Sequence, residues 1–187
     1  THNMKTNLSE EMEYCYQPQL CSLKPEKAEI FQGYRRRNGQ AAIRNEIWVI
    51  PTVGCVNDVA KKFVQDNQHL VAGNIDGLHT FTHPFGCSQT GKDHAQTRKI
   101  LTSLVKHPNA GAVLVLELGC ENLTHEQFVQ ELGSYDPDRV KFLKCQDVED
   151  EFTEAAKLLK ECVDYAGQFE RQPIPVSELV IGMKCGG

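Results

Sequence analysis

Residues 112–116 read Ala-Val-Leu-Val-Leu, a continuous apolar run that is typical of a strand buried on both faces. A less regular run extends over residues 75–82, and similar short runs lie at residues 47–50, 140–143 and 179–182, with residues 70–73 as a further candidate piece. Between them lie patterns with helical spacing, which begin at Asn57 or Asp58 and cover residues 93–107, 124–133 and 147–168. Strands and helices therefore alternate along the chain.

This alternation predicts a parallel sheet whose strands are joined by right-handed crossovers. We expect an α/β domain over residues 31–187, a three-layer, doubly wound (Rossmann- or flavodoxin-like) and mostly parallel sheet of about five strands with helices on both faces. Residues 1–30 are mostly polar, contain prolines and show no sustained period, which is typical of a linker or strap.

The composition excludes several classes of protein. Hydrophobic residues make up 40% of the 187 residues and charged residues 24%, an ordinary globular balance. The net charge of −5 gives no reason to expect nucleic acid or an anionic membrane as a partner, and no apolar run approaches the roughly 20 residues of a membrane span. The eight cysteines are spread out without a Cys-x-x-Cys pair, so we expect reduced thiols in the cytoplasm.

The cysteines also follow the predicted strands. Ligands of open parallel sheets bind beyond the carboxyl ends of the strands. Cys55, Cys87, Cys120, Cys145 and Cys185 each come soon after one of the predicted strands. We therefore expect these thiols at the same edge of the sheet, spread over more width than one site needs.

The loop after the second predicted strand carries two histidines and a cysteine. His79, Phe81 and His83 point to one face of an extended chain. Beside Gly86 and Cys87, the histidines are candidates for metal ligation or for general acid–base chemistry, because imidazole titrates near neutrality. The structural alternative is a histidine that is hydrogen-bonded at the end of a strand.

The same loop nearly matches a phosphate-binding motif. Residues 86–93 have the glycine and lysine spacing of such a loop, but Asp93 stands where Ser or Thr would hold magnesium. Because a carboxylate at this position would repel phosphates, a nucleotide- or phosphate-binding module is kept only as an alternative.

Two further segments end predicted strands with glycine. Residues 119–122 (Gly-Cys-Glu-Asn) offer a metal ligand, a base and a hydrogen-bond donor, or else a turn before a helix capped by Thr124. Residues 184–187 (Lys-Cys-Gly-Gly) combine a lysine that can balance a carboxylate with glycines that admit a close ligand. Arg44 and Asn45 precede the first strand, where a salt bridge or turn explains them, and the basic residues 35–37 are ascribed to solvent unless the ligand is anionic.

Together these segments resemble a known family. The resemblance is carried by residues 31–35 (Phe-Gln-Gly-Tyr-Arg), 44–57 (Arg-Asn-Glu-Ile-Trp-Val-Ile-Pro-Thr-Val-Gly-Cys-Val-Asn), 83–89 (His-Pro-Phe-Gly-Cys-Ser-Gln), 107–110 (His-Pro-Asn-Ala), 118–122 (Leu-Gly-Cys-Glu-Asn) and 182–187 (Gly-Met-Lys-Cys-Gly-Gly). In order and spacing they resemble the altronate dehydratase and galactarate dehydratase family, nearest to its altronate branch. Sulfolactate sulfo-lyase belongs to the same wider group. The opening Thr-His-Asn resembles the end of the family's small N-terminal SAF domain.

The resemblance implies a reaction and a cofactor. The reaction would remove water from altronate and give 2-keto-3-deoxygluconate, with a divalent metal, Fe²⁺ or alternatively Mn²⁺. A SAF domain would precede residues 1–30 and a larger domain would follow residue 187, so the piece alone would be inactive. The other functions considered are galactarate dehydration, a sulfo-lyase activity and a scaffold role.

The resemblance also suggests roles for individual residues. A metal would stabilise the enediolate that forms when a base removes the α-proton of the sugar acid. The catalytic candidates are His83, as acid or base, Lys184 and Glu121. The candidates for substrate contact are Arg44, Asn45, Asn57, Gln89, Asn122, Gly86 and Gly119. The candidates for the metal are Cys87, Cys120 and His2, with Cys55 and Cys185 as further candidates.

Overall fold

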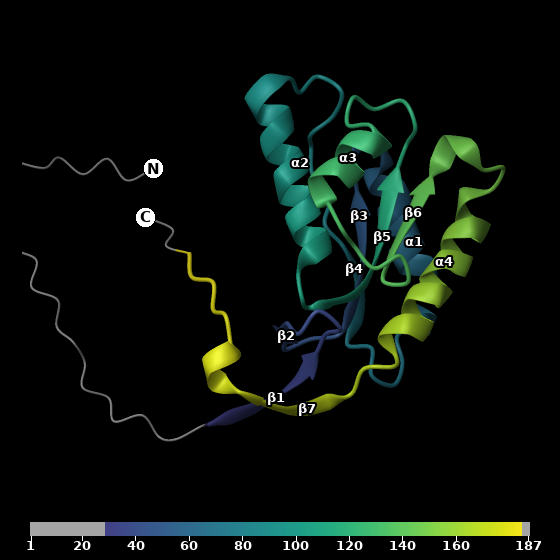
Figure 1. The fold of residues 1–187 in the computed structure, drawn as a ribbon. Helices are drawn as coiled ribbons and strands as arrows, with labels where there is room; N and C mark the ends of the chain where they lie inside the picture. The colour runs from purple at the N-terminus through teal and green to yellow at the C-terminus, as the bar shows by residue number, and fades with distance from the viewer. Residues whose placement is uncertain (1–28, 185–187) are drawn as a thin grey trace, which may run out of the picture.

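The computed structural model describes residues 29–184 (Figure 1). The predicted strap over residues 1–30 therefore lies outside the described residues except at its end, where Ile30 already begins a strand. The metal candidates His2 and Cys185 also lie outside them. Among the described residues, no helix is long and apolar enough to cross a bilayer.

A parallel sheet of four strands forms the centre of the protein. Its strands are β3 (Glu46–Pro51), β4 (Gly77–Thr80), β5 (Ala110–Glu117) and β6 (Val140–Lys144), arranged in the order β4-β3-β5-β6. Every neighbouring pair is parallel, with Trp48 opposite Val113 and Val115 opposite Phe142. The predicted α/β class is thus confirmed, with four strands in this sheet where about five were expected.

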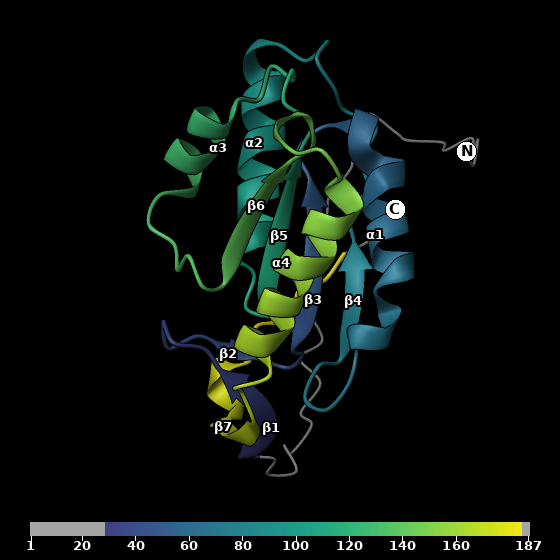
Figure 2. The same cartoon turned by 90° about the vertical axis from the view of Figure 1, so that its right-hand side faces the viewer.

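Helices cover both faces of this sheet (Figure 2). On one face lie α1 (Asn57–Asp66) and α4 (Glu151–Ala166), and on the other α2 (Gly91–Lys106) and α3 (His125–Leu132). Successive residues of β3 point to opposite faces of the sheet. Ile47 packs with α1 and α4, and Trp48 packs with α2 and α3. Every residue of β5 is buried, as expected for a central strand covered on both faces.

A second, antiparallel sheet lies at the amino ends of the parallel strands (Figure 1). This sheet was not predicted. It contains β2 (Ala41–Ala42), β1 (Ile30–Arg35) and β7 (Arg171–Pro175) in the order β2-β1-β7. A turn at Asn38-Gly39 joins β1 to β2, with Gly39 at a φ of 84°. Short 3₁₀ helices complete the described elements: η1 (Gly54–Val56), η2 (Gln68–Leu70), η3 (Cys145–Asp147) and η4 (Val176–Glu178).

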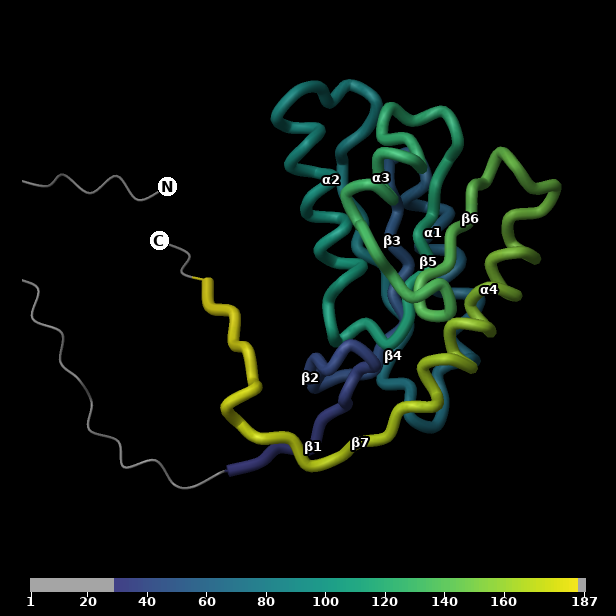
Figure 3. The backbone as a smooth tube through the Cα atoms, in the orientation of Figure 1, coloured from purple at the N-terminus to yellow at the C-terminus, as the bar shows by residue number. Residues whose placement is uncertain are grey.

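The prediction of a strand at residues 179–182 was wrong. This segment forms no strand in the structure and runs apart from the α/β body after η4 (Figure 3). Val180 and Ile181 are 92% and 72% exposed, so the apolar run is not buried by the described residues. Residues 70–73 are likewise not a strand, because η2 and a turn lead to β4.

Helix caps were predicted with mixed success. Thr124 forms the expected capping box with Gln127 at the start of α3. At α1, however, the cap position is Val56 and no side chain caps the helix. Asn57 is instead the first helical residue, and its amide donates a hydrogen bond to the backbone oxygen of His83 at 2.8 Å. Its side chain therefore joins two loops and caps no helix.

Candidate functional site

The carboxyl ends of β3 and β5 lie side by side at the centre of the sheet. The connection that follows β3 leads to β4 on one side, and the connection that follows β5 leads to β6 on the other side. The two connections therefore leave in opposite directions. A crevice forms at such a switch in an open α/β sheet, and ligands bind there. The loops that follow β3, β4 and β5 contain most of the candidate residues.

A buried carboxylate ties the loop after β5 to the end of β3. Thr52 donates its hydroxyl to Glu121 at 2.8 Å, and the backbone N–H groups of Leu118 and Gly119 donate to the same carboxylate at 3.1 and 2.6 Å. Glu121 is only 9% exposed. Since three donors of the chain itself already engage this carboxylate, its evident task in the structure is to shape the loop. Gly119 has a φ of 122°, which a residue with a side chain rarely adopts.

His83 lies against the end of β3 with one ring nitrogen unpaired. Its Nε2 is 3.0 Å from the carbonyl oxygen of Pro51, which can only accept, so Nε2 carries the proton. Its Nδ1 is buried and has no hydrogen-bond partner among residues 29–184. The ring of Phe85 stacks on the imidazole at 5.7 Å. A buried side-chain nitrogen without a partner is rare in folded proteins, which marks His83 as a candidate functional residue.

The loop that carries His83 is held closely against η1. Gly54 donates its N–H to the backbone oxygen of Phe85 at 2.6 Å. A Cβ atom at Gly54 would come within 3.0 Å of that oxygen and 3.1 Å of the backbone oxygen of His83. Asn122, on the loop after β5, donates its amide to the backbone oxygen of Gln89 at 2.6 Å. The structure therefore brings together Asn57, His83, Gly86, Gln89, Gly119, Glu121 and Asn122 on three linked loops.

The predicted metal donors lie on the same loops without forming a complete ligand set. Cys55, Cys87 and Cys120 are exposed free thiols, one on each of three loops. Cys145, after β6, is half-buried, and burial raises the pKa of its thiol to about 11. Within residues 29–184, no three His, Cys, Asp or Glu side chains come together in a way that could hold a metal ion. These residues thus supply at most part of a metal site.

A histidine–carboxylate pair that was not predicted from the sequence lies at the same edge. His125, the first residue of α3, lies with Nδ1 3.0 and 3.2 Å from the two carboxylate oxygens of Glu117, the last residue of β5. The Glu117 side chain is 4% exposed and that of His125 is 43% exposed, while Phe142 meets the imidazole edge-on at 4.8 Å. The carboxylate orients the ring with Nε2 turned away from it, as in many catalytic histidines. The capping box at Thr124 was the available signal, because it fixes His125 as the first helical residue.

Replacing Glu117 with Gln should change how stability depends on pH. Burial is the main cause that raises the pKa of Glu117 above its usual value, and the hydrogen bond from His125 offsets this only in part. The folded protein therefore keeps this proton at a higher pH than the unfolded chain does, and the contribution to stability is lost as the pH rises through the raised pKa. Chemical unfolding should show that the free energy of unfolding of the wild type falls between about pH 4 and about pH 7. This fall should be smaller in Glu117→Gln.

The matched control is Glu126, an exposed residue of α3 next to His125. Its pKa is lowered, chiefly by a hydrogen bond from its own backbone N–H, so its contribution to stability is present at neutral pH and lost as the pH falls. Glu126→Gln should therefore shift the pH dependence in the opposite sense. Equal pH dependences for the wild type and Glu117→Gln would contradict a raised pKa.

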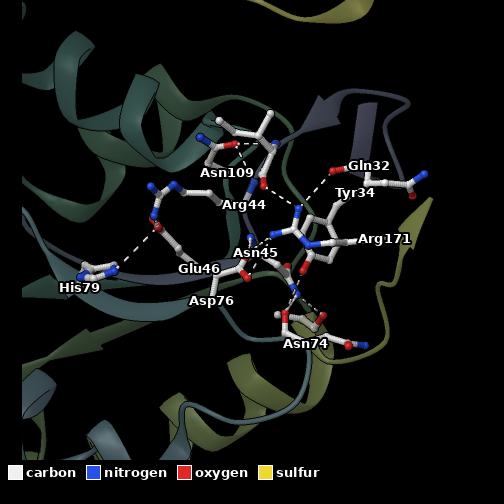
Figure 4. A network of polar contacts seen from close by, with 12 residues as sticks. Gln32, Tyr34, Arg44, Asn45, Glu46, Asn74, Asp76, His79, Asn109 and Arg171 are labelled. Carbon is white, nitrogen blue, oxygen red and sulfur yellow. Dashed lines mark hydrogen bonds and ion pairs between the residues drawn. The ribbon is translucent and has the colours of Figure 1, made fainter. Parts of the chain in front are cut away.

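Three candidates are not brought to this edge. Arg44 and Asn45 precede β3 at its amino end, where Arg44 pairs with Glu46 at 3.0 Å and the Asn45 side chain is buried in a network of polar contacts (Figure 4). Lys184 is exposed beyond η4 and, since no strand forms at residues 179–182, no element of the sheet holds it at the carboxyl edge.

The chain is similar to several known proteins. A family model described as D-galactarate dehydratase/Altronate hydrolase, second domain, matches residues 33–167. Altronate dehydratase of Escherichia coli (strain K12) is 44% identical over 191 residues, which cover 100% of this chain and 38% of that protein. Altronate dehydratase of Bacillus subtilis (strain 168) is 45% identical over 192 residues, with the same coverage. The beta subunit of (2R)-sulfolactate sulfo-lyase from Chromohalobacter salexigens is 31% identical over 161 residues, or 86% of this chain and 39% of that protein. The chain thus spans less than two fifths of the length of these relatives.

Proposed function

This chain belongs to the D-galactarate dehydratase/altronate hydrolase family, and we propose that it forms the second domain of a dehydratase that removes water from altronate to give 2-keto-3-deoxygluconate. The observation that carries this proposal is 44–45% identity to two altronate dehydratases over the whole chain. Galactarate dehydration and a sulfo-lyase reaction are the alternatives, because relatives with those names match less closely, at 27% and 31% identity.

In this proposal, histidines at the carboxyl edge of the parallel sheet transfer the protons. The reaction needs a base for the α-proton of a carboxylate and an acid for the departing hydroxide. His83 is the first candidate: its Nε2 lies 3.0 Å from the backbone oxygen of Pro51, and its buried Nδ1 has no hydrogen-bond partner among residues 29–184. His125, oriented by Glu117, is the second candidate, and an acid and a base on neighbouring loops suit a dehydration. The side chain of Gln89 and the exposed surface of the loop at Asn122 are left for the hydroxyl groups of the sugar acid.

A divalent metal, Fe²⁺ or alternatively Mn²⁺, is the cofactor in this proposal, and it would supply the positive charge that stabilises an enediolate. Cys87 and Cys120 would be part of its ligand set, since thiolates suit ferrous iron. The described residues do not assemble three donors, so further ligands have to come from outside residues 29–184.

Two further proposals concern the fold and the location. The strand order β4-β3-β5-β6, with helix pairs on both faces, supports a doubly wound, flavodoxin-like arrangement of the parallel sheet. The free thiols among the described residues support the cytoplasm as the compartment.

An anaerobic assay of the full-length protein, loaded with ferrous iron, tests the function by comparing altronate with galactarate. Formation of a 2-keto-3-deoxy sugar acid from altronate, with little from galactarate, is the expected result. Turnover of galactarate alone would transfer the function to that branch of the family. If a folded, iron-loaded protein turns over neither, the dehydratase assignment fails, and assays for release of sulfite from sulfolactate and for binding of magnesium-ATP decide between the remaining alternatives.

A further inference from the structure

A cavity of about 510 Å³ opens at the amino ends of the parallel strands, opposite the candidate functional site. Its walls come from the turn between β1 and β2, the last residues of α2 and α3, the start of β6 and the end of α4. Its volume is within the range of about 300–1,000 Å³ that small-molecule pockets occupy. The proposed dehydratase reaction makes no use of it.

The lining of this cavity is strongly cationic. Four cationic side chains face a single carboxylate, which leaves a formal excess of three positive charges, although the whole chain carries −5. The cations are Arg36, Arg37, Lys106 and Arg139, and the carboxylate is Asp136. Arg37, 3.3 Å away, and the hydroxyl of Tyr165, at 2.8 Å, already engage Asp136. Positive charge concentrated in a concave surface attracts anions.

Two of the cations are buried against uncharged acceptors. Arg36, 5% exposed, donates to the backbone oxygens of Pro108 and Arg44 and to the side-chain oxygen of Asn45. Arg139 donates from Nε and Nη2 to the backbone oxygens of Ala110 and His107. In the part of the chain that the structure describes, neither guanidinium forms an ion pair with a carboxylate. Carbonyl oxygens carry partial charges and leave much of each positive charge uncompensated.

The pKa values of Arg36 and Arg139 are both lowered in this arrangement. Burial, followed by the charge of Arg139, lowers the pKa of Arg36 to about 10. Burial also lowers the pKa of Arg139. Buried like charges without a counter-ion are costly, and groups perturbed in this way cluster at functional sites. An anion in the cavity would relieve the repulsion.

Hydrogen-bond donors are also available to such an anion. Nη1 of Arg139 makes no hydrogen bond among residues 29–184 and is not one of the atoms that the protein encloses without a partner. Arg37 lies over the ring of Tyr165 at 4.7 Å, and its contacts to Asp136, Gln168 and Asp138 are long, at 3.3, 3.4 and 3.8 Å. Lys106, at the end of α2, is exposed and forms no ion pair among these residues.

We propose that this cavity binds a small oxyanion, a carboxylate or a phosphate group, between the guanidinium of Arg139 and the side chains of Arg37 and Lys106. The free Nη1 of Arg139 carries N–H donors for either oxyanion, and the ammonium group of Lys106 adds charge without demanding one geometry. Val105, Leu132 and Val140 form an apolar part of the wall, where the carbon skeleton of the ligand can pack. Two of the basic residues 35–37, Arg36 and Arg37, would thereby face an anionic ligand, while Arg35 pairs with Glu178.

Calorimetric titration of the full-length protein with inorganic phosphate, and separately with succinate, tests this site in chloride buffer of matched ionic strength. The wild type should bind at least one of them saturably, and the preferred one identifies the group that the site recognises. In Arg37→Gln/Lys106→Gln the affinity should fall about tenfold for each cation removed. Lys99→Gln, on the same helix but outside the cavity, is the matched control and should bind as the wild type does.

The side chains of Arg37 and Lys106 lie at the surface, so the double variant should keep its fold, which its melting temperature and circular dichroism verify. The proposal is overturned if the wild type binds neither anion saturably, or if the folded double variant binds as tightly as the wild type. Because the titration does not depend on turnover, its result is independent of the dehydratase assay.

Discussion

Replacing Asn45 with alanine is expected to lower the free energy of unfolding by about 4 kcal/mol, because it leaves several buried groups without their hydrogen bonds. Asn45 is fully buried between β1 and β3 (Figure 4). Its side-chain oxygen accepts from Arg36 at 2.7 Å, and its amide donates to the backbone oxygens of Asn74 and Ala166, each at 2.9 Å. A single side chain thus connects the antiparallel hairpin, the loop before β4 and the end of α4.

Urea unfolding of Asn45→Ala and of the wild type measures this loss. Asn38→Ala is the matched control, since Asn38 is exposed and its side chain bonds only within its own turn, to Gln40. The control should lose about 1 kcal/mol or less. A loss at Asn45 no larger than at Asn38 would mean that water replaces all three bonds, and the network would then carry little stability.

Replacing His83 with alanine is expected to lower kcat of the full-length protein in the proposed dehydration by about 10²- to 10⁴-fold, the usual contribution of one general acid or base. The fold should persist, because the hydrogen bonds between Asn57 and the backbone of His83 do not involve the imidazole. The measurement is the anaerobic assay with altronate, and it applies once the wild type has been shown to turn over. Circular dichroism of the variant verifies that the loss is chemical.

Two further histidines complete this experiment. His69 lies exposed in η2, away from the carboxyl ends of the strands, so His69→Ala should keep the wild-type kcat. His125→Ala measures the share of the pair formed with Glu117. A kcat of His83→Ala close to that of the wild type, with a large loss in His125→Ala, would assign the proton transfer to His125 and remove it from His83.

The central strands could be predicted because a strand that is buried on both faces has a locally apolar sequence. β5 is buried at every residue, and its sequence is apolar up to Glu117; β3 is likewise buried throughout, whereas β6 is buried only at Val140 and Leu143. The cap of α3 was equally predictable, since the capping box needs only Thr124 and Gln127. These features depend on residues that are close together in the sequence.

The antiparallel sheet could not be predicted in this way. β7 contains Pro173 and Pro175, which lack the N–H that a strand donates, and the sequence therefore resembles a loop. It becomes a strand by pairing with β1, where Phe31 lies opposite Ile174 across most of the length of the chain. Residues 179–182 show the converse error: their composition suits a buried strand, but no described strand pairs with them.

The loops that carry the candidate site were predictable from the sequence, because residues that follow parallel strands meet at one edge of the sheet. The role of each side chain there depends on the three-dimensional arrangement. The fold leaves Nδ1 of His83 without a partner among residues 29–184, engages the carboxylate of Glu121 in its own loop, and joins His125 to Glu117. It also brings the basic turn at Arg36 next to Arg139, which directly precedes the last parallel strand. The physical reason is that pairing, burial and the electric field at a side chain depend on neighbours from distant parts of the chain, and local sequence does not specify those neighbours.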